Sequence, residues 1–140
     1  MKLSKSFSLE ELVASSTAKK LNIDNTPGTK ELNNLIKLVT TVLQPIRDKY
    51  GKPIIISSGY RCPKLNKAVG GSATSQHKTG QAADIHSSSN TEKDNMILWN
   101  IICDMVKNGE IKTGQYIFEY GHKDVGPDWI HVSTPGNHLN

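Results

Sequence analysis

Two long amphipathic segments limit what this chain can fold into. In KELNNLIKLVTTVLQPIRDKY, residues 30–50, apolar residues recur at helical spacing, and we expect Pro45 to kink this helix near its end. The segment SSNTEKDNMILWNIICDMVKNG, residues 88–109, predicts a second long helix with Asn90 or a nearby serine as its cap and Gly109 as its terminator. Each helix has one apolar stripe, which another layer of the fold must cover.

Short strand patterns supply that layer. A run of three isoleucines in KPIIISSGY predicts a buried strand, and AADIH, GQYIFEYG and DWIHVS predict further strands. The helices are gathered early and in the middle of the chain, and the strands return through short turns. This order favours an α+β fold, a small, mainly antiparallel sheet with helices on one face. We expect the other face to carry the functional site.

Composition and charge exclude several classes of protein. The chain has 140 residues, of which 36% are hydrophobic and 21% charged, and its formal net charge is +4. A chain of this length can bury a core without metals or disulfides. We therefore expect a single domain over residues 1–140, with residues 1–28 as an N-terminal extension packing on it, and a monomer. The lysines are scattered and no aromatic residues interleave with them, which argues against a nucleic-acid partner.

The N-terminal segment MKLSKSFSLEELVASS does not have the pattern of a secretory signal. It carries lysines but lacks an unbroken apolar run, and no window of the chain approaches a membrane span. We therefore expect synthesis in the cytoplasm without a signal peptide and no insertion into a membrane. Ser8 and Glu11 have the spacing of a capping box, which predicts a short helix here.

Three residues of types that bind zinc are spread over different predicted elements. His77 lies in the irregular loop VGGSATSQHKTGQ, Asp84 in the strand AADIH, and His131 in the strand DWIHVS. Catalytic zinc sites take three protein ligands and keep a fourth position for water. The spacing of these residues alone does not identify a site, because histidine and aspartate at such separations are common by chance.

Three blocks of the chain, SGYR, SQHKTGQAADIH and DWIHVS, together resemble the zinc D-Ala-D-Ala carboxypeptidases and the related L-Ala-D-Glu endolysins. Their pattern is SxHxxGxAxD followed much later by a histidine strand, and order, spacing and flanking residues agree over about residues 29–133. The resemblance implies the fold shared with hedgehog signalling domains. It also implies zinc as the cofactor, with His77, Asp84 and His131 as its ligands.

The same resemblance implies roles for the residues around the ligands. Asp128, three residues before the last ligand, corresponds to the general base that activates the zinc-bound water, and Glu119 is the competing base. Arg61 corresponds to the residue that binds the scissile carbonyl oxygen or a substrate carboxylate. Ser75 corresponds to a serine that hydrogen-bonds the substrate carboxylate, although helix capping or loop ordering explains a serine equally well. Trp129 either walls the substrate groove or packs in the core.

His86 follows Asp84 on the same face of its strand. Three roles are open for it, as an alternative metal ligand, as a partner of a ligand, or as a substrate contact. We favour a role other than metal ligand, because three ligands are already assigned and the family pattern ends at the aspartate.

We therefore expect a zinc-dependent metallopeptidase that hydrolyses peptidoglycan stem peptides. Both D-Ala-D-Ala carboxypeptidases and L-Ala-D-Glu endopeptidases use this machinery, and the resemblance covers both types. The alternative is a non-catalytic, zinc-containing module that binds cell wall or has a structural role, but the presence of Asp128 and Arg61 favours the enzyme. Such a chain resembles a phage or prophage lysis enzyme that acts on the cell wall after release from the cytoplasm.

Overall fold

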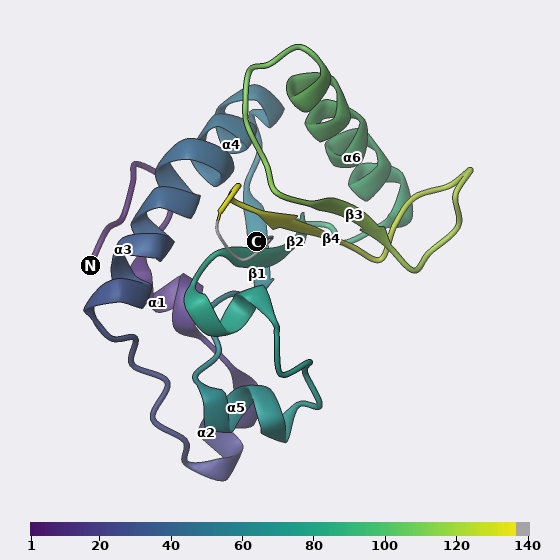
Figure 1. Cartoon of the computed structure of the whole chain (residues 1–140). Helices are drawn as coiled ribbons and strands as arrows, with labels where there is room; N and C mark the ends of the chain where they lie inside the picture. The colour runs from purple at the N-terminus through teal and green to yellow at the C-terminus, as the bar shows by residue number, and fades with distance from the viewer. Residues whose placement is uncertain (137–140) are drawn as a thin grey trace.

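The computed structural model describes residues 1–136, in which four strands form one sheet (Figure 1). The sheet order is β1-β2-β4-β3, and all three pairings are antiparallel. The chain therefore has the α+β fold expected from its sequence, consistent with a small hedgehog or D,D-peptidase-like fold. The strands are β1 (Ile54–Ser58), β2 (Ala82–Ser87), β3 (Tyr116–Glu119) and β4 (Trp129–Ser133).

The first long amphipathic segment forms one continuous helical run in three parts. These are α3 (Thr29–Leu38), the π-helical turn η1 (Val39–Leu43) and α4 (Gln44–Tyr50). Pro45 lies in the first turn of α4. A proline ring clashes with the carbonyl of the preceding helical turn, and the wider π turn relieves that clash. The irregularity therefore lies just before Pro45, and the helix continues beyond it.

The second long segment forms α6 (Glu92–Lys107) with a different cap from the one expected. The side chain of Thr91 accepts a hydrogen bond from the N–H of Asp94 at 3.2 Å, which makes Thr91 the N-cap. Asn90 instead has a φ of +52° in the preceding turn, a conformation that asparagine tolerates better than most residues. Gly109 follows the helix with a φ of +74°, as expected for a terminator.

Alternation along the strands decides which side chains face the helices. Ala83 and Ile85 of β2 and Ile130 of β4 are fully buried in the core that α3, α4 and α6 share with the sheet. Asp84 and His131 point to the opposite face, where the register pairs them directly. The face that the long helices leave uncovered is therefore the one with the polar residues.

Residues 1–28 pack against the same core. They form α1 (Leu9–Val13), which has the expected capping box, and α2 (Ser16–Leu21). Phe7 and Leu12 are fully buried within the core cluster. Within the described residues, no helix is both long and apolar enough to cross a membrane.

Two short helices border the uncovered face of the sheet. They are α5 (Pro63–Ala68) and the 3-10 helix η2 (Gln76–Thr79). Helix α5 contacts both η2 and α2. Figure 1 shows α2 and α5 together at one end of the molecule, away from α6. This end forms a wall beside the polar face of the sheet.

Candidate metal centre

Asp84 lies between two histidines that come from different elements. His77 belongs to η2, Asp84 to β2 and His131 to β4. Asp84 Oδ1 lies 3.4 Å from His77 Nε2 and 3.0 Å from His131 Nδ1. One ligand atom from each residue lies within 4.8 Å of the other two, and no second group of this kind occurs in residues 1–136. The fold thus brings together the three residues predicted as metal ligands.

The two separations around Asp84 fit a zinc ion. Zinc bonds of about 2.0–2.1 Å in a tetrahedral arrangement put neighbouring ligand atoms about 3.3 Å apart. The separations of 3.0 and 3.4 Å around Asp84 lie on either side of that value. Two imidazole nitrogens and one carboxylate oxygen are also a donor set of catalytic zinc sites, which keep a fourth position open. The residues present therefore fit this metal.

His77 is held by the loop that follows β1. Its Nδ1 donates a hydrogen bond to the carbonyl of Gly59 at 2.7 Å, since a carbonyl oxygen can only accept. In the neutral ring this leaves Nε2 without a proton, on the side of Asp84. The ring is buried, and the carbonyl of His77 accepts a hydrogen bond from the N–H of Arg61 at 3.0 Å. Such a tie on the second ring nitrogen is typical of metal-binding histidines.

Asn25 holds the same loop from the N-terminal side. Its side-chain amide donates to the carbonyls of Val13 and Tyr60, both at 2.9 Å. Its side-chain oxygen accepts a hydrogen bond from the N–H of Cys62 at 2.8 Å. Asn25 is buried, and its hydrogen bond to the carbonyl of Tyr60 is buried as well, so this carbonyl depends on Asn25 for a partner. The N-terminal extension is thus tied to the segment that supports His77.

Close backbone packing adds to this support at Gly59. The N–H of Tyr60 donates to the carbonyl of Leu12 in α1 at 2.7 Å, which brings the two segments together. A Cβ on Gly59 would collide with the same carbonyl of Leu12. Glycine is therefore required in the SGYR block for a steric reason.

Gln76, which the sequence analysis did not single out, positions His131. Its Oε1 accepts a hydrogen bond from His131 Nε2 at 3.0 Å, which leaves Nδ1 as the nitrogen beside Asp84. The available signal was that Gln76 directly precedes the ligand His77 in sequence. Nothing local indicates that its side chain reaches a histidine on β4.

Asp84 carries the negative charge of the centre. Burial by itself raises the pKa of this carboxyl, but hydrogen bonds and charges from His131 and His77 outweigh burial and lower the pKa from 3.8 to about 2. The carboxylate is therefore ionised at neutral pH, which is the form that binds a metal ion.

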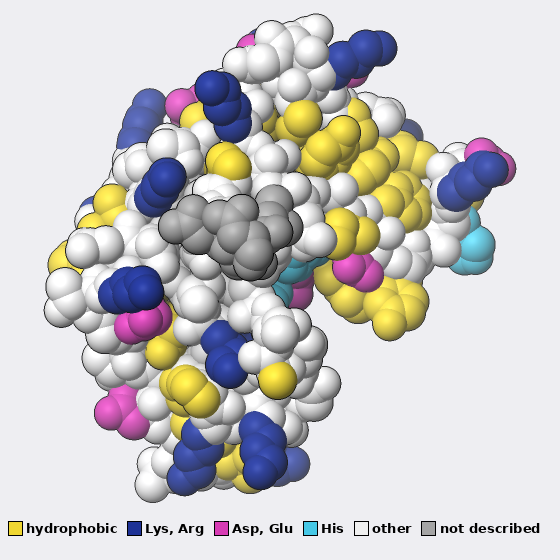
Figure 2. All heavy atoms as spheres, viewed as in Figure 1, with side chains coloured by type: hydrophobic (Ala, Val, Ile, Leu, Met, Phe, Trp, Pro, Cys, Tyr) yellow, Lys and Arg dark blue, Asp and Glu magenta, His cyan; other side chains and the backbone are white. Residues whose placement is uncertain are grey.

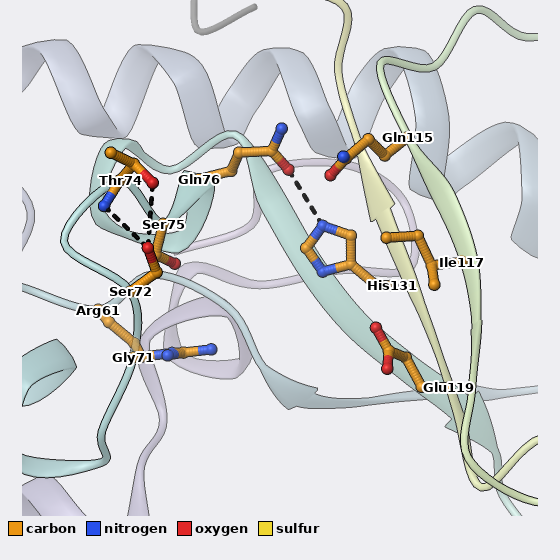
Figure 3. A pocket seen from close by; sticks show the side chains of 10 residues that line it. All are labelled: Arg61, Gly71, Ser72, Thr74, Ser75, Gln76, Gln115, Ile117, Glu119 and His131. Carbon is orange, nitrogen blue, oxygen red and sulfur yellow. Dashed lines mark hydrogen bonds between the residues drawn. The ribbon is translucent and has the colours of Figure 1, made fainter.

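A pocket of about 500 Å³ opens beside the three residues (Figure 3). Gln115, Ile117 and Glu119 line it from the β3 side, and His131 lines it from β4. Arg61 and the segment before His77 form the opposite wall. Figure 2 shows histidine and acidic side chains gathered at a hollow in this face of the molecule. The volume lies within the range of about 300–1,000 Å³ typical of ligand sites.

Arg61 presents a fixed cation to this pocket. Its Nε donates to Ser58 Oγ at 3.2 Å, and its Nη1 donates to Asn66 Oδ1 at 3.0 Å. A Cβ on Gly71 would collide with the side-chain oxygen of Asn66, so the glycine leaves room for this contact. Burial lowers the pKa of Arg61, and the charge of Asp84 opposes that effect. A held guanidinium of this kind suits the stabilisation of a negative oxygen.

Ser75 and Trp129 occupy different positions relative to the pocket. Ser75 lines it, and its hydroxyl also accepts a hydrogen bond from the N–H of His77 at 3.2 Å, so it caps η2. Trp129 is half-buried, and its ring packs on that of Tyr120 with centroids 5.0 Å apart. It does not line this pocket. The structure therefore brings Ser75, but not Trp129, to the wall of the pocket.

The two candidate bases differ in their position relative to the pocket. Glu119 lines the pocket together with His131 (Figure 3). Asp128 is exposed and does not line it, and its N–H donates to the carbonyl of Glu119 at 3.0 Å. The hydrogen bond and charge of Glu92 raise the pKa of His122 in the connecting loop, and the charge of Asp128 adds to this effect. Of the two carboxylates, only that of Glu119 therefore lines the pocket.

His86 lies on the same face of β2 as Asp84 but outside the group of three. Its Nδ1 donates a hydrogen bond to the carbonyl of Ser87 at 2.6 Å. This arrangement favours the role other than metal ligand.

Two histidines and a carboxylate beside a pocket, on the open face of a small antiparallel sheet, are the arrangement of a metal-dependent peptidase. The family model described as Peptidase M15 matches residues 5–124, and the chain belongs to this family of metallopeptidases. The match confirms the resemblance found in the three sequence blocks. It includes His77 and Asp84 and ends before His131, which the structure brings next to them. No curated protein matches the chain.

Proposed function

We propose that this chain is a zinc-dependent peptidase that hydrolyses the stem peptides of peptidoglycan. The observation that carries the proposal is a His-Asp-His group beside a pocket that also has a carboxylate, Glu119, and a fixed cation, Arg61. Membership of the M15 family supports peptide hydrolysis. The choice of peptidoglycan rests on the resemblance of SGYR, SQHKTGQAADIH and DWIHVS to enzymes that act on cell wall.

In this proposal each of three pocket residues has its own role in hydrolysis. When bound, zinc supplies a Lewis acid and lowers the pKa of a water molecule towards neutrality. Glu119 accepts the proton of the attacking water and returns it to the leaving amine. Arg61 stabilises the charge that develops on the carbonyl oxygen, and Ser75 contributes a hydroxyl to substrate binding.

We favour Glu119 over Asp128 as the base because Glu119 lines the pocket beside His131 and Asp128 does not. Ile117 pairs with His131 across β3 and β4, and Glu119 lies two residues further along the same strand face. A general base must come within hydrogen-bonding reach of the proton that it removes. Asp128, the base that the family resemblance implies, is the alternative and requires its exposed side chain to turn into the pocket.

The test is incubation of the zinc-loaded chain with purified peptidoglycan and with defined stem peptides, followed by mass analysis of the products. We expect released peptides or amino acids, and their loss on addition of a chelator. A protein with verified zinc content that releases nothing from either substrate would contradict the proposal. Retention on the wall without cleavage would support the non-catalytic alternative.

We also propose that the chain acts at the cell wall in a phage or prophage lysis role. The resemblance to the endolysins supports this part of the proposal, and the substrate is found at that location. Expression of the chain together with a pore-forming protein, compared with expression of either one alone, tests it by the loss of culture turbidity.

A further inference from the structure

We infer that the substrate chain is bound on both sides of the cleaved bond, so that this protein cuts an internal peptide bond. The inference rests on the proposed function and chooses between its two types. The observation behind it is a second pocket of about 280 Å³ that shares Arg61 with the first one. Any peptidase contacts its substrate on both sides of the cleaved bond, but only cleavage of an internal bond requires that the substrate can continue beyond the site in both directions.

The two pockets lie over different strands of the sheet. The first is lined by residues of β3 and β4, and the second by Ser57 and Ser58 at the end of β1. Asp84, on β2, lies between them in the sheet order β1-β2-β4-β3. Its Cα pairs with that of Ser58 on one side and with that of His131 on the other. A peptide that crosses this face over the metal ligands therefore meets a pocket in both directions.

Arg61 makes the two pockets parts of one binding surface. It lines both of them, and its guanidinium is held in place by Ser58 and Asn66. The side chain is half-buried, so it forms part of the wall and does not project freely into solvent. A single extended substrate can thus contact the same cation while it occupies both pockets.

The lining of the second pocket indicates what it binds. Side-chain hydroxyls dominate it, and no aspartate, glutamate or lysine belongs to it. Hydroxyls both donate and accept hydrogen bonds, which suits the amide groups and short polar side chains of a peptide. Its volume of about 280 Å³ lies near the lower end of the range of about 300–1,000 Å³ typical of ligand sites, so it has room for only a short segment. The hydroxyl residues are Ser15, Ser16, Thr17, Ser57, Ser58 and Tyr60.

The outer wall of the second pocket is open to solvent. Ser16, at the start of α2, is exposed, and the side chain of Val69, just after α5, is 44% exposed. A substrate is therefore not forced to end inside this pocket and can continue beyond it. This is the property that cleavage of an internal bond requires.

The inference is tested with peptides of different length and with variants of the protein in which the second pocket is filled. The long peptide carries at least three residues on each side of the candidate bond, and two truncated peptides each lack one side. The variants Ser16→Trp and Val69→Trp each put a large side chain at a residue that lines the second pocket. Lys20→Trp is the matched control, because Lys20 is exposed on the same helix and lines neither pocket. The measurements are kcat/KM for the zinc-loaded chain and Kd by calorimetry for the full chain in chelator.

We expect cleavage of an internal bond, with kcat/KM for the long peptide at least about tenfold above that for the peptide truncated on the side of the second pocket. Both pocket variants should reduce this ratio to near one, and Lys20→Trp should retain it. The Kd values in chelator should show the same order, since the second pocket does not depend on the metal.

The possible failures are distinguishable. Release of a terminal residue alone, at equal rates from long and truncated peptides, would overturn the inference and leave the proposed function in place. Complete lack of cleavage by the zinc-loaded chain would contradict the proposed function, and calorimetry would still test the second pocket. The inference would be overturned by equal Kd values for the long and truncated peptides. It would also be overturned if Lys20→Trp lost as much affinity for the long peptide as the two pocket variants.

Discussion

The Nδ1 of His77 donates a hydrogen bond of 2.7 Å to the carbonyl of Gly59, which ties a candidate metal ligand to the loop after β1. That loop is held in turn by Leu12 and Asn25 of the N-terminal segment. The direction of the ligand nitrogen therefore depends on residues that belong to none of the three sequence blocks. Changes in this support should weaken metal binding without removing a ligand.

Asn25→Ala tests that dependence. The substitution leaves the buried carbonyl of Tyr60 and the N–H of Cys62 without partners, so we expect a loss of about 3 kcal/mol in the free energy of unfolding. Because His77 rests on the same loop, zinc affinity should fall by about tenfold. Chemical denaturation and zinc titration measure the two effects. Asn33→Ala, at an exposed position of α3, is the control. Equal losses of stability and zinc affinity in this variant would contradict the role of Asn25 in supporting His77.

Gln76→Ala should weaken zinc binding through His131. Without the acceptor on Nε2 the ring of His131 loses its fixed orientation, and we expect a fall in zinc affinity of about 10–100-fold. Gln76→Glu keeps an acceptor oxygen and should recover most of the affinity. Gln115→Ala serves as the comparison, because Gln115 lines the same pocket and its N–H donates to Ser133 Oγ. Unchanged affinity in Gln76→Ala would mean that the hydrogen bond does not orient the ligand.

His77→Ala should abolish stoichiometric zinc binding, because it removes one of three protein ligands. His86→Ala should retain it, since His86 lies outside the group and bonds to the carbonyl of Ser87. Metal content after dialysis, measured by atomic spectroscopy, separates the two variants. Loss of zinc in His86→Ala would instead make that residue a ligand.

Glu119→Gln should lower kcat by about 10²–10⁴-fold and leave zinc bound, because it removes the proton acceptor and keeps the shape of the side chain. Asp128→Asn should lower kcat by less than about threefold, since Asp128 is exposed and lines no part of the pocket. Steady-state rates on a stem peptide, with zinc content determined in parallel, provide the comparison. The opposite ranking of the two variants would establish Asp128 as the base.

Zinc should raise the stability of the folded chain. An ion that binds the folded state alone stabilises it by about 2.7 kcal/mol when its concentration is 100 times Kd. Thermal unfolding with and without zinc should therefore show a rise in Tm, which His131→Ala should remove. A rise of equal size in His131→Ala would indicate that zinc binds elsewhere on the protein.

Local patterns in the sequence predicted most of the secondary structure. The apolar spacing in residues 30–50 and 88–109 determined two long helices, since periodicity acts within a few turns. The cap of α6 was assigned wrongly to Asn90 or a nearby serine. Several neighbouring residues there can all cap a helix, and the backbone turn at Asn90 decided in favour of Thr91.

The sequence by itself determined the residue types of the candidate metal centre and, through strand alternation, that Asp84 and His131 point away from the core. His77, Asp84 and His131 were identified from motifs that need no tertiary information. Only the tertiary structure decided what surrounds them. The register of β3 against β4 put Glu119 at the pocket, and the contacts of Gln76 and Gly59 selected which ring nitrogens face Asp84. These relationships join segments far apart in sequence, so they depend on how the chain packs and leave no local pattern.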